Sequence, residues 1–134
     1  MSSIFSQIIA KKIPCYQIAE NEDCFAFLDI NPNTKGHTLC VTKQEIDRLL
    51  DLPKDQYVKL MEFSYTVGVA IEAVIPCNRV GMSVIGLEVP HVHVHLIPLN
   101  SMADVTFEKK VSLSTQQMQS IANEIRQEYH KQNK

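Results

Sequence analysis

The stretch VPHVHVHLIP, from Val89 to Pro98, places three histidines at strict alternation. A β-strand repeats every two residues, so a strand here would point His91, His93 and His95 out of one face of a sheet. The apolar residues between and after them would point into a core on the opposite face. Three of the five histidines in the chain therefore form an ionisable row on a strand with an apolar reverse face, which indicates a chemical site.

The composition is typical of one globular domain. The chain has 134 residues, of which 45% are hydrophobic and 21% are charged, and its formal net charge is −2. A charge this small gives no general attraction to nucleic acid or to an anionic membrane surface. No apolar run approaches the roughly 20 residues that a membrane span needs. We therefore expect a single domain over residues 1–134 that binds neither nucleic acid nor membrane.

The N-terminal sequence and the cysteines predict a cytoplasmic protein. The opening residues, MSSIFSQIIAKKIP, lack the basic segment and the long apolar core of a signal peptide. The cysteines are dispersed and include no C-x-x-C pair; they are Cys15, Cys24, Cys40 and Cys77. Without export these thiols stay reduced, so we expect no disulfide framework.

Short apolar or alternating segments predict the remaining strands of the sheet. They cover residues 16–20, 23–30, 37–42 and 79–86, and the turn-forming sequence NPNTKG separates the second from the third. Together with the histidine strand they predict an antiparallel sheet of about five strands.

Three segments carry helical signals. A short helix is predicted from about Ile4, capped by one of the two serines before it. Apolar residues spaced three and four apart predict a long helix between Pro53 and Ile75. A capping box that begins at Ser114 predicts a C-terminal amphipathic helix. We expect the helices to lie on one side of the sheet, which makes an α+β domain.

Three alternating histidines suit three roles. They can bind a metal ion, they can carry nucleophilic chemistry at phosphorus, or they can lie on an exposed strand face without a special function. Neighbouring same-face residues on a strand stand about 6.5–7 Å apart, whereas zinc holds its nitrogen ligands at about 2.1 Å. This spacing favours a phosphate group, which is wider than a metal ion, because imidazoles this far apart can reach its different oxygens; metal binding is left open.

The histidine stretch resembles the His-x-His-x-His-x-x motif of the histidine triad (HIT) superfamily, in which x is apolar. A second block, FAFLDINPNTKGHTLCVT, resembles the family segment in which Asp-Ile precedes a turn and then Gly-His-Thr. The opening IFSQIIAKKIPCYQIAE is similar to the N-terminal region of Hint-like and bacterial members. The resemblance implies a HIT-like α+β fold with one long helix, a motif-bearing core at about residues 4–98, and a C-terminal loop and helix at about residues 99–134.

The resemblance also implies an activity. Family members cleave nucleoside phosphoramidates, related nucleotidyl esters or dinucleoside polyphosphates at the α-phosphate, without a cofactor. The middle histidine, here His93, would attack phosphorus and form a nucleotidyl-histidine intermediate that water hydrolyses. His95 would contact phosphate oxygens and help to protonate the leaving group, while His91 and His37 would complete the polar cluster. For His37, capping of the following strand is the alternative.

A nucleotide site is implied by the same resemblance. Asp29 matches the acidic residue that binds the ribose hydroxyls, and an Asx turn into the following loop is the alternative role. Further positions expected to contact the nucleotide are Phe5, Ile9, Leu28, Ile30, Ser83, Glu88 and Val89. By periodicity alone, the apolar members of this set could equally belong to the core.

The chain departs from the family pattern near the phosphate. Leu87 occupies the position of a glutamine, and Ser83 falls near the position of an asparagine, so fewer amide donors remain. Glu88 stands where some relatives have serine. The sequence Ser3-Ile4-Phe5-Ser6 replaces a C-x-x-C pair that contributes to a zinc site in some bacterial relatives, so we expect no metal.

The leading interpretation is a hydrolase of purine nucleoside monophosphate conjugates that forms a homodimer across the long helix and an edge strand. Burial inside the monomer would explain the apolar face of that helix equally well. Two other functions stay open. One is a weakly catalytic or non-catalytic purine-nucleotide-binding regulatory module, which the missing donors favour. The other is a metal-dependent hydrolase that uses the histidine row as ligands.

Overall fold

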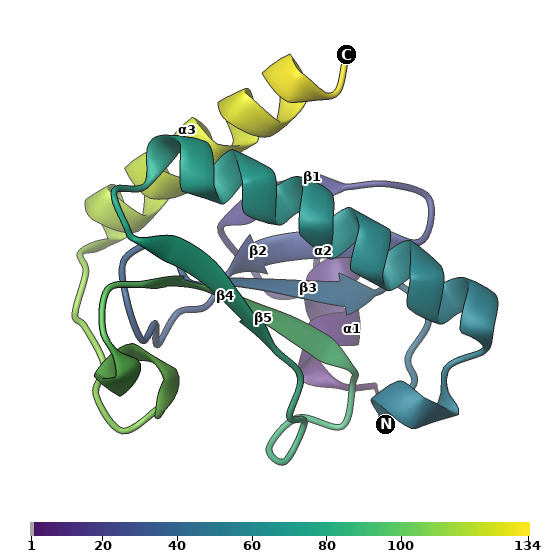
Figure 1. Ribbon diagram of the computed structural model, residues 1–134. Helices are drawn as coiled ribbons and strands as arrows, with labels where there is room; N and C mark the ends of the chain where they lie inside the picture. The colour runs from purple at the N-terminus through teal and green to yellow at the C-terminus, as the bar shows by residue number, and fades with distance from the viewer. Residues whose placement is uncertain (1) are drawn as a thin grey trace.

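A five-stranded antiparallel sheet forms the centre of the structure, with its strands in the spatial order β1-β2-β3-β5-β4 (Figure 1). The computed structural model describes residues 2–134. Its elements are α1 (Ile4–Ile9), β1 (Gln17–Glu20), β2 (Cys24–Leu28), β3 (Thr38–Thr42), η1 (Leu49–Asp51), α2 (Lys54–Val74), β4 (Arg79–Ser83), β5 (His93–Leu99), η2 (Met102–Val105) and α3 (Thr115–Gln132). The predicted α+β fold and its predicted strands are confirmed.

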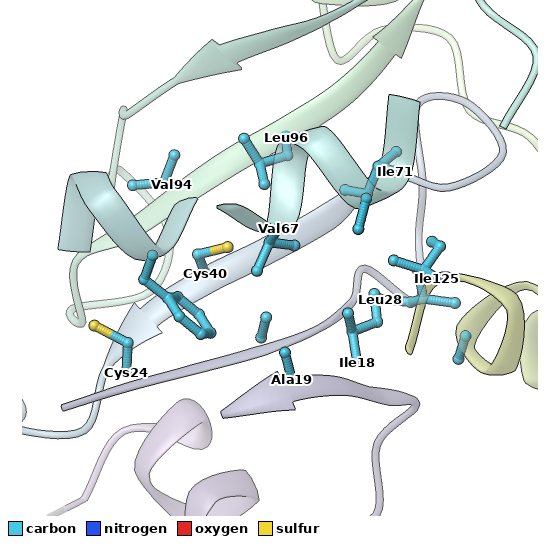
Figure 2. Packing of buried hydrophobic residues seen from close by; sticks show 14 of the residues in the cluster. Ile18, Ala19, Cys24, Leu28, Cys40, Val67, Ile71, Val94, Leu96 and Ile125 are labelled. Carbon is cyan, nitrogen blue, oxygen red and sulfur yellow. The ribbon is translucent and has the colours of Figure 1, made fainter. Parts of the chain in front are cut away.

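Helices α2 and α3 cover one face of the sheet and build the larger core (Figure 1). Their buried side chains pack on residues of β1, β2, β3 and β5, and these residues alternate along β2 and β5 (Figure 2). The labelled members of this core are Ile18, Ala19, Cys24, Leu28, Cys40, Val67, Ile71, Val94, Leu96 and Ile125. Full burial of one such aliphatic side chain contributes about 1.5–3 kcal/mol, so this packing fixes both helices on this face.

The predicted long and C-terminal helices are confirmed, with small differences. Helix α2 buries one face, whereas Tyr57, in its first turn, is 42% exposed; the buried residues are Leu60, Phe63, Ser64, Val67, Ala70 and Ile71. Helix α3 begins with the predicted capping box, in which Ser114 and Gln117 exchange side-chain-to-backbone hydrogen bonds. Within residues 2–134, no helix has the length and the hydropathy that crossing a bilayer requires.

Helix α1 corrects the expectation that the helices lie on one side of the sheet. It packs on the opposite face from α2 and α3, where Phe5 and Ile8 join a second cluster with Phe25 and Phe27. Both faces of β2 are buried, so the aromatic residues of that strand require a cover of their own. The short α1 supplies it, and its N-cap is Ser3, as one of the two predicted alternatives.

Strand β5 has the predicted alternation. Val92, Val94 and Leu96 lie in the core under α2, each at most 1% exposed. The histidines between them therefore emerge on the α1 face. His91 lies just before the strand and bonds its N–H to the carbonyl of Val89, 2.8 Å away, so it is not part of the β-ladder.

Candidate active site

Four histidines converge where β5 lies beside β3, on the face that α1 partly covers. His93 and His95 belong to β5, His37 immediately precedes β3, and His91 lies two residues before the first residue of β5. All four are buried, with exposed fractions between 0% and 8%. The ring centroids of His93 and His95 are 4.9 Å apart, and those of His37 and His95 are 5.2 Å apart.

The hydrogen bonds of His93 define which of its nitrogens is free. Its Nδ1 lies 2.7 Å from the carbonyl oxygen of His91. A carbonyl only accepts, so Nδ1 carries the proton and donates it. In the neutral ring Nε2 then holds a lone pair, and it forms no hydrogen bond with any described residue. His93 thus has the form that nucleophilic attack requires, with one nitrogen held and the other available.

His37 and His95 form a second chain of defined tautomers. The backbone N–H of Asn33 donates to Nδ1 of His37 at 2.9 Å, which places the proton of neutral His37 on Nε2. That Nε2 lies 3.0 Å from Nδ1 of His95 and donates to it. Neutral His95 therefore carries its own proton on Nε2, where it can serve as a hydrogen-bond donor to a ligand.

His91 is anchored at both nitrogens. Its Nε2–H donates to the carbonyl of Thr42 at 2.7 Å, and its Nδ1 accepts from the hydroxyl of Ser3 at 2.7 Å. Ser3 also caps α1, and the carboxylate of Glu45 accepts from the Ser3 N–H at 2.7 Å and from the Ser6 hydroxyl at 2.6 Å. His91 is thus a structural support that ties α1 to the carbonyl on which His93 depends.

Burial keeps His37 and His95 neutral at pH 7. Desolvation, together with the charges of His95 and Lys110, lowers the pKa of His37 to about 3. Desolvation, together with the charges of His93 and Lys110, lowers the pKa of His95 to about 4. Burial also lowers the pKa of His91. The opposite shift holds for a carboxyl group, so burial raises the pKa of Asp29.

Asp29, His37 and His95 bring potential ligand atoms within 4.8 Å of one another, which suggests a metal. The hydrogen bonds do not fit one. Asn33 donates to Nδ1 of His37, so the nitrogen that faces His95 carries a proton and has no lone pair for a metal. A metal-ligating histidine normally donates its other N–H to a support, the reverse of what Asn33 enforces.

Three of the predicted nucleotide-binding residues lie together on the α1 side of the histidines. Phe5 packs edge-on against His91 and His93, with centroids 5.8 and 5.0 Å apart. Ile9 and Val89 are partly buried against the same cluster as Phe5. These apolar groups lie at the α1 end of the histidine row.

Asp29 lies at the other end of the row. Its Oδ2 is 3.6 Å from Nε2 of His37, and its Oδ1 accepts from the backbone N–H of Asn31 at 2.8 Å. The predicted Asx turn is therefore present, and one carboxylate oxygen remains beside the cluster. The next residue, Ile30, is 78% exposed.

Two predicted polar residues, Ser83 at the end of β4 and Glu88 in the loop before β5, differ in burial. Ser83 pairs with His95 across β4 and β5, and its hydroxyl is buried without a hydrogen-bond partner among the described residues. Glu88 is exposed, and its charge adds to burial in raising the pKa of Asp29, so it lies near that carboxylate. Leu87 is 89% exposed.

Leu28 is a correction, because it cannot line a pocket on the histidine face. It is 1% exposed and lies with Ile18 and Ile125 in the core under the large helices (Figure 2). The pleat of β2 sends Phe27, its neighbour, to the histidine side. The error has a simple cause, since both residues belong to one apolar run.

Two contacts of Phe107 to the histidines, and one of Lys110 to the neighbouring Asn33, were not predicted. The Phe107 ring packs against His95 and His37, with centroids 4.8 and 6.0 Å apart. The Lys110 ammonium donates to the side-chain oxygen of Asn33 at 2.7 Å. Phe107 is an isolated aromatic residue in a polar loop, and that is the one sequence signal that could have indicated its contact.

Comparison with known proteins identifies the family to which this chain belongs. Residues 10–102 match the HIT domain family. The chain is a HIT domain protein. A HIT-like protein of Methanocaldococcus jannaschii is 38% identical over 102 residues, which are 71% of this chain and 77% of that protein. The adenosine 5′-monophosphoramidase of Schizosaccharomyces pombe is 34% identical over 103 residues, covering 73% of this HIT chain and 74% of the relative.

A solved structure extends the likeness of the HIT fold to nearly the whole chain. The zinc-bound histidine triad family protein of Mycobacterium smegmatis superimposes with a TM-score of 0.85 over 99% of this chain and 96% of that one, at 20% identity. At this identity the comparison supports the fold alone.

Proposed function

We propose that the protein hydrolyses nucleoside phosphoramidates, or related nucleotidyl esters and dinucleoside polyphosphates, at the α-phosphate through a nucleotidyl-His93 intermediate. One observation carries the proposal: the His91 carbonyl holds Nδ1–H of His93, which leaves the Nε2 lone pair free of protein partners. The relatives that are named adenosine 5′-monophosphoramidases support the substrate class.

The proposed reaction has two displacements at phosphorus. In the first, Nε2 of His93 forms a bond to the α-phosphorus while the bond to the leaving nitrogen or oxygen breaks. The leaving atom takes a proton from solvent, and the Nε2–H of neutral His95 donates a hydrogen bond to it. In the second, water attacks the same phosphorus, the bond to His93 breaks, and the proton lost by water passes to solvent. One water is consumed, and a donor that stabilises the developing charge lowers the barrier of each step.

The remaining groups position the substrate. Asp29 offers a carboxylate oxygen to the ribose hydroxyls, and Phe5, Ile9 and Val89 offer an apolar surface to a purine. Ile30 and Glu88 are exposed near Asp29, and the unpartnered hydroxyl of Ser83 can donate to a phosphate oxygen. No step requires a metal or a cofactor.

The first test is hydrolysis of adenosine 5′-phosphoramidate in the presence of a chelator. We expect turnover by the wild type and by His130→Ala, an exposed histidine on α3, and loss of turnover in His93→Ala. Turnover that survives in His93→Ala would refute the proposed nucleophile. Activity that disappears with the chelator and returns with zinc would support the metal-dependent alternative instead.

A nucleotide-binding module with little turnover is the second candidate function. The exposed side chain of Leu87, where a donor is expected, favours it. A wild-type protein that binds AMP but hydrolyses neither phosphoramidates nor dinucleoside polyphosphates would establish this alternative.

Homodimerisation is part of the same proposal. The edge strand β4 and helix α2 border a groove of about 430 Å³, lined by apolar residues that include Tyr65, Val69 and Met82. These three side chains are 70%, 41% and 49% exposed. Light scattering should give a dimer that Met82→Lys dissociates and Leu50→Lys, at an exposed site in η1, does not.

A cytoplasmic location completes the proposal. The four cysteines of the described chain are free thiols, and Cys24 and Cys40 are buried in the core, which supports a reducing compartment.

A further inference from the structure

The segment from Asn100 to Val111 folds back against the loop that precedes His37, and the reaction described above does not use it. The N–H of Val111 donates to the carbonyl of Pro32 at 3.0 Å. The side-chain amide of Asn33 donates to the carbonyl of Asp104 at 3.0 Å. These two bonds hold the segment beside the histidine cluster.

Phe107 adopts a backbone conformation that is uncommon for a bulky residue. Its φ is +63°, in the left-handed region that favours glycine. Such conformations persist where the surroundings hold them, and they concentrate at functional sites. In this conformation the Phe107 ring packs against the histidine cluster, with its centroid 4.8 Å from the centroid of the His95 ring.

Lys110 lies against the Phe107 ring and the side chain of Asn33, two groups that carry no charge. Its ammonium lies 5.0 Å from the Phe107 ring centroid and donates to Oδ1 of Asn33 at 2.7 Å. Within residues 2–134, no carboxylate lies within 4.0 Å of it. An ammonium has three donors, so this half-buried group keeps two donors and its full charge for a ligand.

The charge balance of the site requires such a cation. His37 and His95 are neutral at pH 7, because burial first, and then nearby charges, lower the pKa of each. The carboxylates near the cluster, Asp29 and Glu88, would repel an anionic substrate. Lys110 is close enough for its charge to act on Asp29 and on both imidazoles.

We propose that Lys110 is a substrate-binding residue whose ammonium group holds the phosphoryl group that His93 attacks. It does so in place of the side-chain donor that Leu87 cannot supply. This inference rests on the proposed function for the identity of the attacked group. The Phe107 ring and the Asn33 amide position the ammonium, and no carboxylate of the described residues lies within ion-pair distance of it.

Calorimetric titration of AMP and adenosine into the wild type, Lys110→Met and Lys109→Met tests the inference. A charge-assisted hydrogen bond predicts that Lys110→Met weakens AMP binding about 10- to 100-fold and leaves adenosine binding unchanged. Lys109 is the exposed neighbour on the same loop, and its variant should bind both ligands as the wild type does. Lys110→Gln, which keeps a donor for Asn33 without the charge, should repeat the loss, and Lys110→Arg should recover most of it.

The outcomes separate this inference from the proposed function. An equal loss of AMP and adenosine binding would show that Lys110 only supports the loop, and an unchanged AMP affinity would also overturn the inference. A loss of turnover confined to substrates with anionic leaving groups would assign Lys110 to the leaving group and overturn it as stated. A wild type that binds AMP through Lys110 but hydrolyses nothing would refute the proposed hydrolysis and retain the inference.

Discussion

Replacing Ser3 by alanine should destabilise the protein well beyond the loss of a helix cap. The Ser3 hydroxyl accepts from the N–H of Ser6 at 3.0 Å and donates to Nδ1 of the buried His91 at 2.7 Å. The variant therefore removes a cap and leaves a buried acceptor without its donor. The Ser6 hydroxyl lies 3.5 Å from the same nitrogen, at the limit of hydrogen-bond range, so it replaces that donor only in part.

The magnitude follows from these two losses. An N-cap substitution by alanine costs about 1 kcal/mol, and an unsatisfied buried polar group costs about 1–3 kcal/mol. Together they predict a decrease of about 2–4 kcal/mol in the free energy of unfolding. Ser114→Ala removes the cap of α3, where the serine is exposed and bonds no histidine, and should cost only about 1 kcal/mol.

Urea denaturation of the two variants and the wild type measures the difference. Ser3→Thr should recover most of the loss, because threonine keeps the hydroxyl. If Ser3→Ala costs no more than Ser114→Ala, the bond from Ser3 to His91 does not support the site, and the reasoning on His91 fails.

Other outcomes follow from burial and backbone geometry. Burial lowers the pKa of His37 to about 3 and that of His95 to about 4, so between these values and 6.5 the unfolded chain binds protons that the folded chain does not. The free energy of unfolding should therefore be retained above pH 6.5 and fall as the pH drops from 6.5 towards 4, and His37→Gln should flatten that slope in urea titrations. Ile125→Ala, in the core at 0% exposure, should lower the free energy of unfolding by about 2–5 kcal/mol, whereas Leu50→Ala, at 85% exposure, should change it by less than about 0.5 kcal/mol. Gly36→Ala should lower the melting temperature, because Gly36 has a φ of +94° and a Cβ there would lie 3.0 Å from Cγ1 of Ile75.

Much of the fold could be predicted because its signals are local. The alternation along β5, the three- and four-residue spacing along α2 and the capping box at Ser114 each specify an element within a short window. The side of the sheet on which α1 packs is not local. It depends on both faces of β2 being apolar, and a continuous apolar run does not reveal which residue meets which helix.

The site was predictable to the extent that its residues lie on β5 and in the block that precedes β3. Leu28 was assigned to the wrong face because strand register decides its side. Phe107 and Lys110 were missed because their loop, whose bonds to Asn33 span 71 and 77 residues of sequence, carries no periodicity that indicates what it contacts. The backbone donor of Asn33, which sets the tautomer of His37, has no side-chain signature at all.

The most direct test of the account is to trap the intermediate. Single turnover of adenosine 5′-phosphoramidate, quenched in alkali and followed by peptide mass spectrometry, should find an adenylyl group on His93. The same adduct should form in His130→Ala and be absent in His93→Ala. Product formation without any adduct, or an adenylyl group on another residue, would contradict the claim that the free Nε2 of His93 is the nucleophile.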